Sequence, residues 1–244
     1  MQTIWTITRR ELSGYFSSPL AYVFIVIFLA LTGSMTFYIG GWLDRGRADL
    51  DTFFNWHPWL YLFLVPAIGM RLWAEERRTG TIEFLTTLPV TTAEAVIGKF
   101  LAAWIFIGAA LFLTFPMWLT VNYLGNPDNG VILAGYIGSW LLAGGMLAIS
   151  TAISALTKNQ VIAFVLAASI CFLFLMSGVE IVQALFSGWA SNAVIDTVSN
   201  LSLLTSFNAI TDGVIDLRHL ILFASLIVIS LFINVALVDL KKGA

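Results

Sequence analysis

Residues that could do chemistry are sparse in this chain of 244 residues, and their spacing decides what they can do. A phosphate-binding loop needs a glycine five residues before its Gly-Lys pair and a Ser or Thr after it, because backbone amides and the Lys hold the phosphates while the hydroxyl holds Mg²⁺. The only Gly-Lys pair is Gly98-Lys99, where Ala93 replaces that glycine and Phe100 replaces the hydroxyl residue. We therefore expect no ATP binding or hydrolysis by this chain itself.

Metal and nucleophilic sites are equally unsupported. The two histidines are His57 and His219, and only Asp216, three residues before His219, stands at a ligand-like spacing from either of them. A carboxylate at that place is explained by the start of a helix. The single cysteine, Cys171, lies in an apolar run. The sequence therefore predicts no catalytic residue, no bound cofactor and no metal ion.

The composition indicates the environment instead. Hydrophobic residues make up 59% of the chain and charged residues 11%, with a mean hydropathy of +0.91. Soluble domains carry roughly 45–50% apolar and about 25% charged residues. The net charge of −2 offers no basic surface to nucleic acid. These values predict an integral membrane protein surrounded by lipids.

The charged residues divide the chain into apolar windows. A helix needs about 20 mostly apolar residues to cross a bilayer. Six windows meet this length, so the predicted fold is an all-α membrane protein with six transmembrane helices. The predicted spans cover residues 20–41, 55–73, 99–122, 131–156, 160–181 and 219–239. The uncharged stretches within 183–217 are too short to cross and predict short extracytoplasmic helices before the last span.

The basic residues orient these spans. Six spans place both termini on one side, which then holds nine of the twelve Lys and Arg residues: Arg9, Arg10, Arg71, Arg77, Arg78, Lys99, Lys158, Lys241 and Lys242. The positive-inside rule makes that side cytoplasmic. Six tryptophans fall near predicted span ends, as interfacial aromatics do: Trp42, Trp56, Trp59, Trp73, Trp140 and Trp189.

The first 19 residues predict an interfacial helix. Apolar residues alternate at roughly helical spacing with a polar set that includes Arg9, Arg10 and Glu11, and Pro19 ends the segment. The alternative is a frayed terminus. Further along, the connection at about 157–160 is so short that the fourth and fifth spans must be antiparallel neighbours. Rows of small residues on these two spans predict close helix packing: Gly144, Ala148, Ala152, Ala163 and Ala167.

The loop between the second and third spans is the most informative segment. The second span is expected to continue through Glu75–Arg78 and to end at Gly80, a common helix-ending residue. Thr91 and Glu94 form a capping box that starts the next helix.

Between these two points the sequence predicts one more short helix. Thr81 can cap it, and Glu83 in its first turn suits the helix dipole. An apolar stripe follows at every third residue, and Pro89 ends the helix; the stripe is Ile82, Leu85 and Leu88. The alternative is a solvated turn whose apolar face rests on the bilayer.

Three segments carry a family resemblance. The run from Glu75 to Leu85 with the following Leu88-Pro89-Val90 resembles the cytoplasmic loop of ABC-2 type transporter permeases. The segment Arg10–Tyr22 and the stretch Leu201–Leu220 are similar to the gliding-motility (GldF-like) branch of that superfamily.

The resemblance implies a bacterial inner-membrane permease that works with partners. These are two cytoplasmic ABC ATPase subunits, which carry ATP and Mg²⁺, a second permease copy or paralogue, and a possible periplasmic or membrane auxiliary protein. Residues 79–89 would form the coupling helix seated in the ATPase. The coupling residues implied are Glu75, Glu76, Arg77, Thr79, Gly80, Thr81, Ile82, Glu83, Leu85, Leu88 and Pro89.

A second hypothesis is a membrane anchor or assembly subunit without a translocation path. A polar face on several spans would separate the two hypotheses. The sequence offers only modest candidates for such a lining: Thr32, Ser34, Thr36, Ser150, Thr151 and Ser154.

Overall fold

The computed structural model describes residues 2–81, 90–187 and 197–242, and every regular element within these ranges is helical. The elements are α1 (Gln2–Ser17), α2 (Pro19–Ser34), the π-helical turn η1 (Met35–Ile39), the short helix η2 (Trp42–Arg45), α3 (Asp51–Asn55), α4 (His57–Gly69), α5 (Arg71–Thr79), α7 (Thr92–Phe112), α8 (Phe115–Leu124), α9 (Asn129–Ser154), α10 (Gln160–Met176), α11 (Glu180–Ser187), α13 (Leu203–Thr211) and α14 (Leu217–Lys242).

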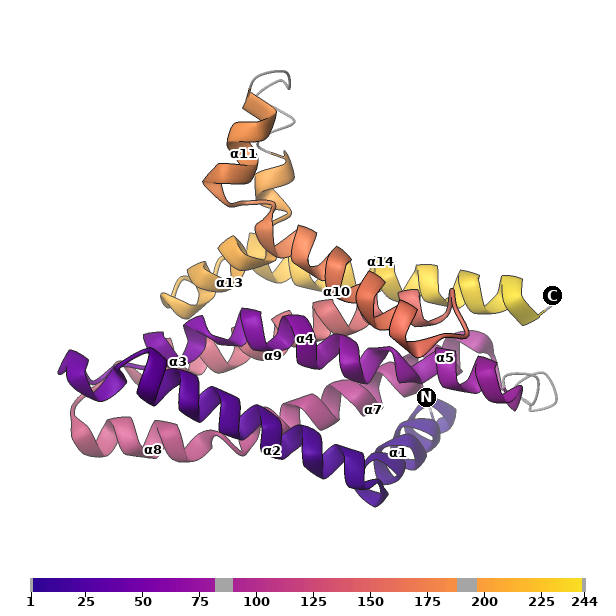
Figure 1. Ribbon diagram of the computed structural model, residues 1–244, viewed down its shortest axis with the longest axis horizontal. Coiled ribbons are helices and arrows are strands. Elements are labelled where there is room, and N and C mark those ends of the chain that lie inside the picture. Colours follow the sequence, from indigo (N-terminus) through magenta and orange to yellow (C-terminus); the bar gives the residue numbers. More distant parts are fainter. Residues whose placement is uncertain (1, 82–89, 188–196, 243–244) are drawn as a thin grey trace.

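Helix α9 is the centre of the bundle. It packs against α4, α7, α10, α13 and α14, and most of its side chains are buried. In Figure 1 the long helices lie along the long axis of the molecule, whereas α11 projects away from them. A helix buried on nearly all sides needs small residues to admit its neighbours, and α9 is rich in Gly, Ala and Ser.

Four helical segments among the described residues are long and apolar enough to cross a membrane: Pro19–Ile39, Thr92–Leu124, Asn129–Ser154 and Leu217–Leu240. The windows expected at 55–73 and 160–181 hold shorter helices. The first is interrupted, because α4 ends at Gly69 and α5 begins at Arg71. The second, α10, has 17 residues and is about 25 Å long.

Helix α10 ends at Met176, two residues before the chain comes close to α13. Gly178 follows this helix, and a Cβ there would lie 2.4 Å from the Thr205 hydroxyl and 2.6 Å from the Ser202 Cβ. The chain thus turns where it meets the start of α13. The helices expected at 183–217 are represented by α11, which starts earlier, at Glu180, and by α13, which packs on α9 and α10; residues 188–196 lie outside the described ranges.

Polar caps mark the ends of the helices. The predicted capping box is confirmed: the Thr91 hydroxyl accepts a hydrogen bond from the Glu94 backbone, and the Glu94 carboxylate accepts one from the Thr91 backbone. Asp128 and Asn159 cap α9 and α10 in a similar way through their side-chain oxygens. Gly80 ends α5 with a left-handed φ of 74°, as its residue type predicts.

One end of the bundle gathers α1, α5 and the C-terminal end of α14 (Figure 1). The Thr92 hydroxyl at the start of α7 donates to the Asp239 carboxylate near the end of α14. Helices α1 and α14 therefore lie at the same end of the bundle as α5 and the start of α7.

A reciprocal tryptophan pair joins α7 to α9. The rings of Trp104 and Trp140 stack with centroids 4.3 Å apart, and the Trp104 indole N–H donates to the Trp140 carbonyl at 2.9 Å. Trp140 therefore lies in the middle of a helix, and its expected place near a span end is wrong. Each ring also covers a glycine of the opposite helix. A Cβ at Gly144 would lie 2.8 Å from the Trp104 Nε1, and one at Gly108 would lie 2.9 Å from the Trp140 Nε1.

The predicted row of small residues is buried, but its members do not all face the same helix. Gly144 approaches Trp104 of α7 rather than α10. The four alanines of the row are all buried, and α10 packs against α9: Ala148, Ala152, Ala163 and Ala167.

Candidate coupling site

The short helix α5 leads directly into the segment expected to couple with an ATPase, so its attachments define the site. Helix α5 begins after a break at Met70, where the Ser154 side chain of α9 takes the place of backbone hydrogen bonds within the helix. The Ser154 hydroxyl donates to the Met70 carbonyl at 2.7 Å and accepts from the backbone N–H groups of Trp73 at 3.2 Å and Ala74 at 3.0 Å. One hydroxyl thus serves three backbone groups that the break would leave unsatisfied.

A close helix approach brings Ser154 to this position. Gly69 ends α4, and a Cβ there would lie 2.4 Å from the Ser150 Cβ of α9. Only a glycine lets α4 come this near to α9. Ser154 follows Ser150 by one helical turn, so it reaches the backbone just beyond Gly69.

The last turns of α5 are held as well. The Arg77 guanidinium donates to the Ala155 carbonyl at 2.8 Å, which satisfies a free carbonyl at the end of α9. The hydroxyls of Thr79 and Thr81 donate to the Glu76 carbonyl, each at 3.3 Å, on either side of Gly80. Helix α5 is therefore attached to α9 along its length. The hydroxyls of Thr79 and Thr81 cap its C-terminal end.

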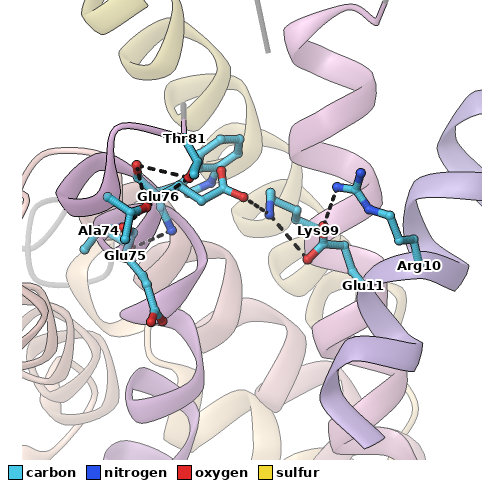
Figure 2. Close-up of polar contacts among 10 residues, drawn as sticks. Arg10, Glu11, Ala74, Glu75, Glu76, Thr81 and Lys99 are labelled. Carbon is cyan, nitrogen blue, oxygen red and sulfur yellow. Dashed lines mark hydrogen bonds and ion pairs between the residues drawn. The ribbon is translucent and has the colours of Figure 1, made fainter. Parts of the chain in front are cut away.

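A nearly buried lysine joins three helices at the other side of α5. The Lys99 Nζ lies 2.6 Å from Glu76 Oε1 of α5 and 3.4 Å from Glu11 Oε2 of α1, with only 6% of its side chain exposed. It also lies over the Trp73 ring, 5.6 Å from the centroid. Figure 2 shows Lys99 between the two carboxylates, with Arg10 reaching Glu11 from outside at 2.9 Å.

The charges of this cluster balance. Burial alone would raise the pKa of Glu11, but the Lys99 ammonium and the Arg10 guanidinium outweigh it and hold that pKa below 4.5. Glu11 is therefore ionised at neutral pH. Two carboxylates with one ammonium and one guanidinium leave the cluster without net charge, which lowers the cost of its partial burial.

Helix α1 lies directly on the start of α7. A Cβ at Gly98 would lie 2.7 Å from the Ile7 Cγ2, so only a glycine admits α1 this closely. The Thr8 hydroxyl donates to the Gly98 carbonyl at 3.2 Å, and the Tyr15 ring stacks on Phe106 with centroids 5.1 Å apart. Residues 2–17 form a helix that is packed on the bundle rather than frayed, and its place at the membrane interface stays a prediction.

The structure brings together some of the residues named from the sequence and not others. Glu76 and Arg77 contact α7 and α9, whereas Glu75 lines a cavity beside α2. Arg9 is exposed on α1. Five of the residues implied as coupling residues lie outside the described ranges: Ile82, Glu83, Leu85, Leu88 and Pro89.

Sequence reasoning missed Lys99 and Ser154 as parts of this site. A signal existed for Lys99, because an ammonium inside an apolar helix calls for a buried partner. Ser154 was a candidate for a polar lining, but its hydroxyl is hydrogen-bonded to backbone groups at the break between α4 and α5. His57 was expected near an outer span end; it is fully buried, with Nδ1 2.8 Å from the Ser139 hydroxyl. No group of three or more His, Cys, Asp or Glu side chains that could hold a metal occurs in the described part of the chain.

Long apolar helices around a buried central helix, with one polar and charged end, define a multi-pass membrane protein. A family model described as ABC-2 family transporter protein matches residues 58–239. This is more than half of the chain, so the chain belongs to that family and is a permease subunit of an ABC transporter. Members of this family are membrane components and are not catalytic themselves. No curated protein matches the sequence.

Proposed function

We propose that this permease couples ATP hydrolysis by two separate cytoplasmic ATPase subunits to export or to mechanical work across the bacterial inner membrane. In this proposal the chain spans the membrane six times with both termini in the cytoplasm. Residues 79–89 form the coupling helix, and a second permease copy or paralogue completes the unit. Similarity to the gliding-motility branch favours mechanical work with a periplasmic or membrane auxiliary partner as one form of this function.

The observation that carries the proposal is the attachment of α5. This helix enters the 79–89 segment, and it is joined to α9 by Ser154 and Arg77 and to α7 and α1 by Lys99. A force applied to the segment at Gly80 would therefore be transmitted to α1, α7 and α9 through contacts of α5 that lie within about two helical turns of Gly80. A loose cytoplasmic loop could not transmit such a force.

The mechanism follows from this connection. ATP binding closes the ATPase dimer and displaces the segment, and α5 carries the displacement into α7 and α9. Such a change requires that the ATPase contact the two permease states with different free energies. The break at Met70 is the place where α5 would change its angle to α4, because the Met70 carbonyl and the Trp73 and Ala74 backbone N–H groups bond to Ser154 instead of to helix partners.

The test is capture of the ATPase by the solubilised permease. We expect the double variant Glu83→Lys with Leu85→Asp to insert normally but to lose the ATPase on co-purification, because it reverses a charge and removes an apolar contact in the segment. The matched control is Lys158→Glu with Leu156→Asp, in the exposed connection between α9 and α10. The control should keep the ATPase.

Two results would contradict the proposal. One is normal ATPase capture and normal ATP-driven activity in the Glu83, Leu85 variant. The other is equal loss of the ATPase in both variants, which would place the contact elsewhere. Capture without any ATP-driven activity in the wild type would support an anchor or assembly subunit instead.

A further inference from the structure

A cavity of about 550 Å³ lies between α1, α2, α4, α5 and α7. Its walls are mainly apolar, and they come from the first two turns of α2, the last turns of α4 and the Phe106 ring of α7. Leu20, Val23 and Ile27 line it and are also exposed, so it opens at the outer surface of the bundle. A long apolar chain could enter from the surrounding lipid without passing through the protein.

The charged part of the lining is confined to one end. Its members are Glu11, Arg71, Glu75, Glu76 and Lys99. The opposite end is formed by Ile27 and Leu64, so the apolar wall of α2 from Leu20 to Ile27 extends about 10 Å from the charged end. This length lies within half of a hydrocarbon core of about 30 Å. The cavity therefore has the polarity and the depth of one bilayer leaflet.

Two of these charges have no partner within the described part of the chain. Glu11, Glu76 and Lys99 neutralise one another in the cluster described above. Arg71 and Glu75 are one turn apart on α5, where opposite charges usually pair. Among the residues that the structure describes, neither their guanidinium nor their carboxylate takes part in an ion pair or a side-chain hydrogen bond. Figure 2 shows the Glu75 side chain extending away from Lys99.

We infer that this cavity binds one phospholipid with a primary-amine headgroup, of the phosphatidylethanolamine type. Its phosphate would pair with Arg71, its ammonium would pair with Glu75, and one acyl chain would lie along Leu20–Ile27. The cytoplasmic position of α5, which belongs to the proposed function, assigns the lipid to the inner leaflet. The binding itself depends only on the cavity and its two unpaired charges.

The headgroup follows from charge complementarity. A phosphatidylglycerol headgroup would satisfy Arg71 with its phosphate, but its uncharged glycerol offers no cation to the Glu75 carboxylate. A phosphatidylcholine headgroup carries a cation without N–H donors, so it cannot give Glu75 the charge-assisted hydrogen bond that an ammonium gives. Only the amine headgroup satisfies both residues.

The inference is tested by competition among lipids. The purified permease, without any ATPase, is reconstituted into nanodiscs with equal amounts of phosphatidylethanolamine, phosphatidylglycerol and phosphatidylcholine that carry the same acyl chains. It is then extracted in mild detergent, and retained lipids are counted by mass spectrometry. We expect about one retained phosphatidylethanolamine per chain, with about tenfold enrichment over phosphatidylcholine, as one charge-assisted contact allows.

Variants separate the parts of the site. Arg71→Leu should reduce retention of all three lipids, because each of them carries the phosphate. Glu75→Gln should remove the preference over phosphatidylcholine, and Ala67→Phe should fill the cavity and reduce retention of all three lipids. Matched controls are Arg78→Leu, an exposed position on α5, and Ala224→Phe, an exposed position on α14. Both should behave as the wild type.

Equal retention of the three lipids by the wild type, unchanged retention in Arg71→Leu, or unchanged selectivity in Glu75→Gln would overturn the inference. So would equal losses in the two controls. Because Glu75→Gln preserves shape, it keeps the test decisive if Arg71→Leu fails to fold. Failure of ATPase capture would leave this readout unaffected, so the inference and the proposed function fail separately.

Discussion

Glu76 of α5 and Lys99 of α7 form an ion pair with 2.6 Å between Oε1 and Nζ, and they lie on opposite sides of the 79–89 segment in the chain. The helix that enters the segment is thus joined to the helix that leaves it. Any movement of α5 relative to α7 must either break this contact or carry α7 along. The pair therefore governs how independently the two sides of the segment can move.

The first prediction concerns the charge balance of this cluster. Lys99→Met should destabilise the protein most, by about 3 kcal/mol, because it leaves two partly buried carboxylates facing each other. Glu76→Gln should cost about 1–2 kcal/mol, and Glu11→Gln should cost less because its partner contact is longer. Thermal unfolding in detergent, followed by far-UV circular dichroism, measures this order.

A variant that removes all three charges provides the control. Lys99→Met with Glu76→Gln and Glu11→Gln should be clearly more stable than Lys99→Met alone, since no unpaired charge remains. If the triple variant is less stable than the single one, the cost arises from lost packing rather than from charge.

The second prediction concerns the hydroxyl at the α4–α5 break. Ser154→Ala removes one acceptor and one donor, which leaves three backbone groups of α5 and Met70 unsatisfied. We expect a loss of about 1–3 kcal/mol and faster amide exchange at Trp73 and Ala74. Ser225→Ala is the matched control, because that exposed hydroxyl donates only to its own helix. Similar behaviour of the two variants would contradict the role of Ser154.

The third prediction tests the reciprocal tryptophan pair. Gly144→Ala places a methyl group 2.8 Å from the Trp104 indole, so α7 must move away from α9. The expected cost is about 1–3 kcal/mol. Gly33→Ala on α2 meets nothing within 4 Å and should be neutral or stabilising. A smaller ring at the partner position, Trp104→Phe, should recover part of the loss in the Gly144→Ala background; no recovery would argue against this contact as the cause.

The fourth prediction is a pH dependence of the α1 attachment. The pKa of Glu11 lies below its ordinary value of 4.5, so its ion pair stabilises the folded form above that value. The contribution is lost as the pH falls through the lowered pKa. Amide protection of α1, corrected for intrinsic exchange, should be constant between about pH 5 and 8 and should fall below about pH 4. The Glu11→Gln variant should not show this fall; the same fall in the variant would assign it to another group.

Local signals in the sequence predicted the helix ends well. Gly80, the Thr91–Glu94 capping box and the helix before Pro19 all depend on neighbours within four residues, and the structure confirms them. The overall membrane class follows from composition alone, because so few charges cannot cover a water-facing surface.

Contacts between distant helices were beyond the sequence. The place of Trp140 depends on Gly108 of another helix, and the break at Met70 depends on Ser154 of another helix. An apolar window of suitable length predicted one span at 55–73. Hydropathy does not report where a hydroxyl replaces a helix hydrogen bond, so it could not place the break at Met70. The same limit applies to the end of α10, where Gly178 meets Ser202.

The contact between α1 and α7 also sets an order of assembly during synthesis. The Thr8 hydroxyl finds its acceptor at Gly98, 90 residues later in the chain. At ribosomal speeds of about 5–20 residues per second, the first helix emerges roughly 5–20 s before its partner does. During that interval the face of α1 that packs on α7 has no partner helix, so this face must be covered by the bilayer or by the insertion machinery until α7 arrives.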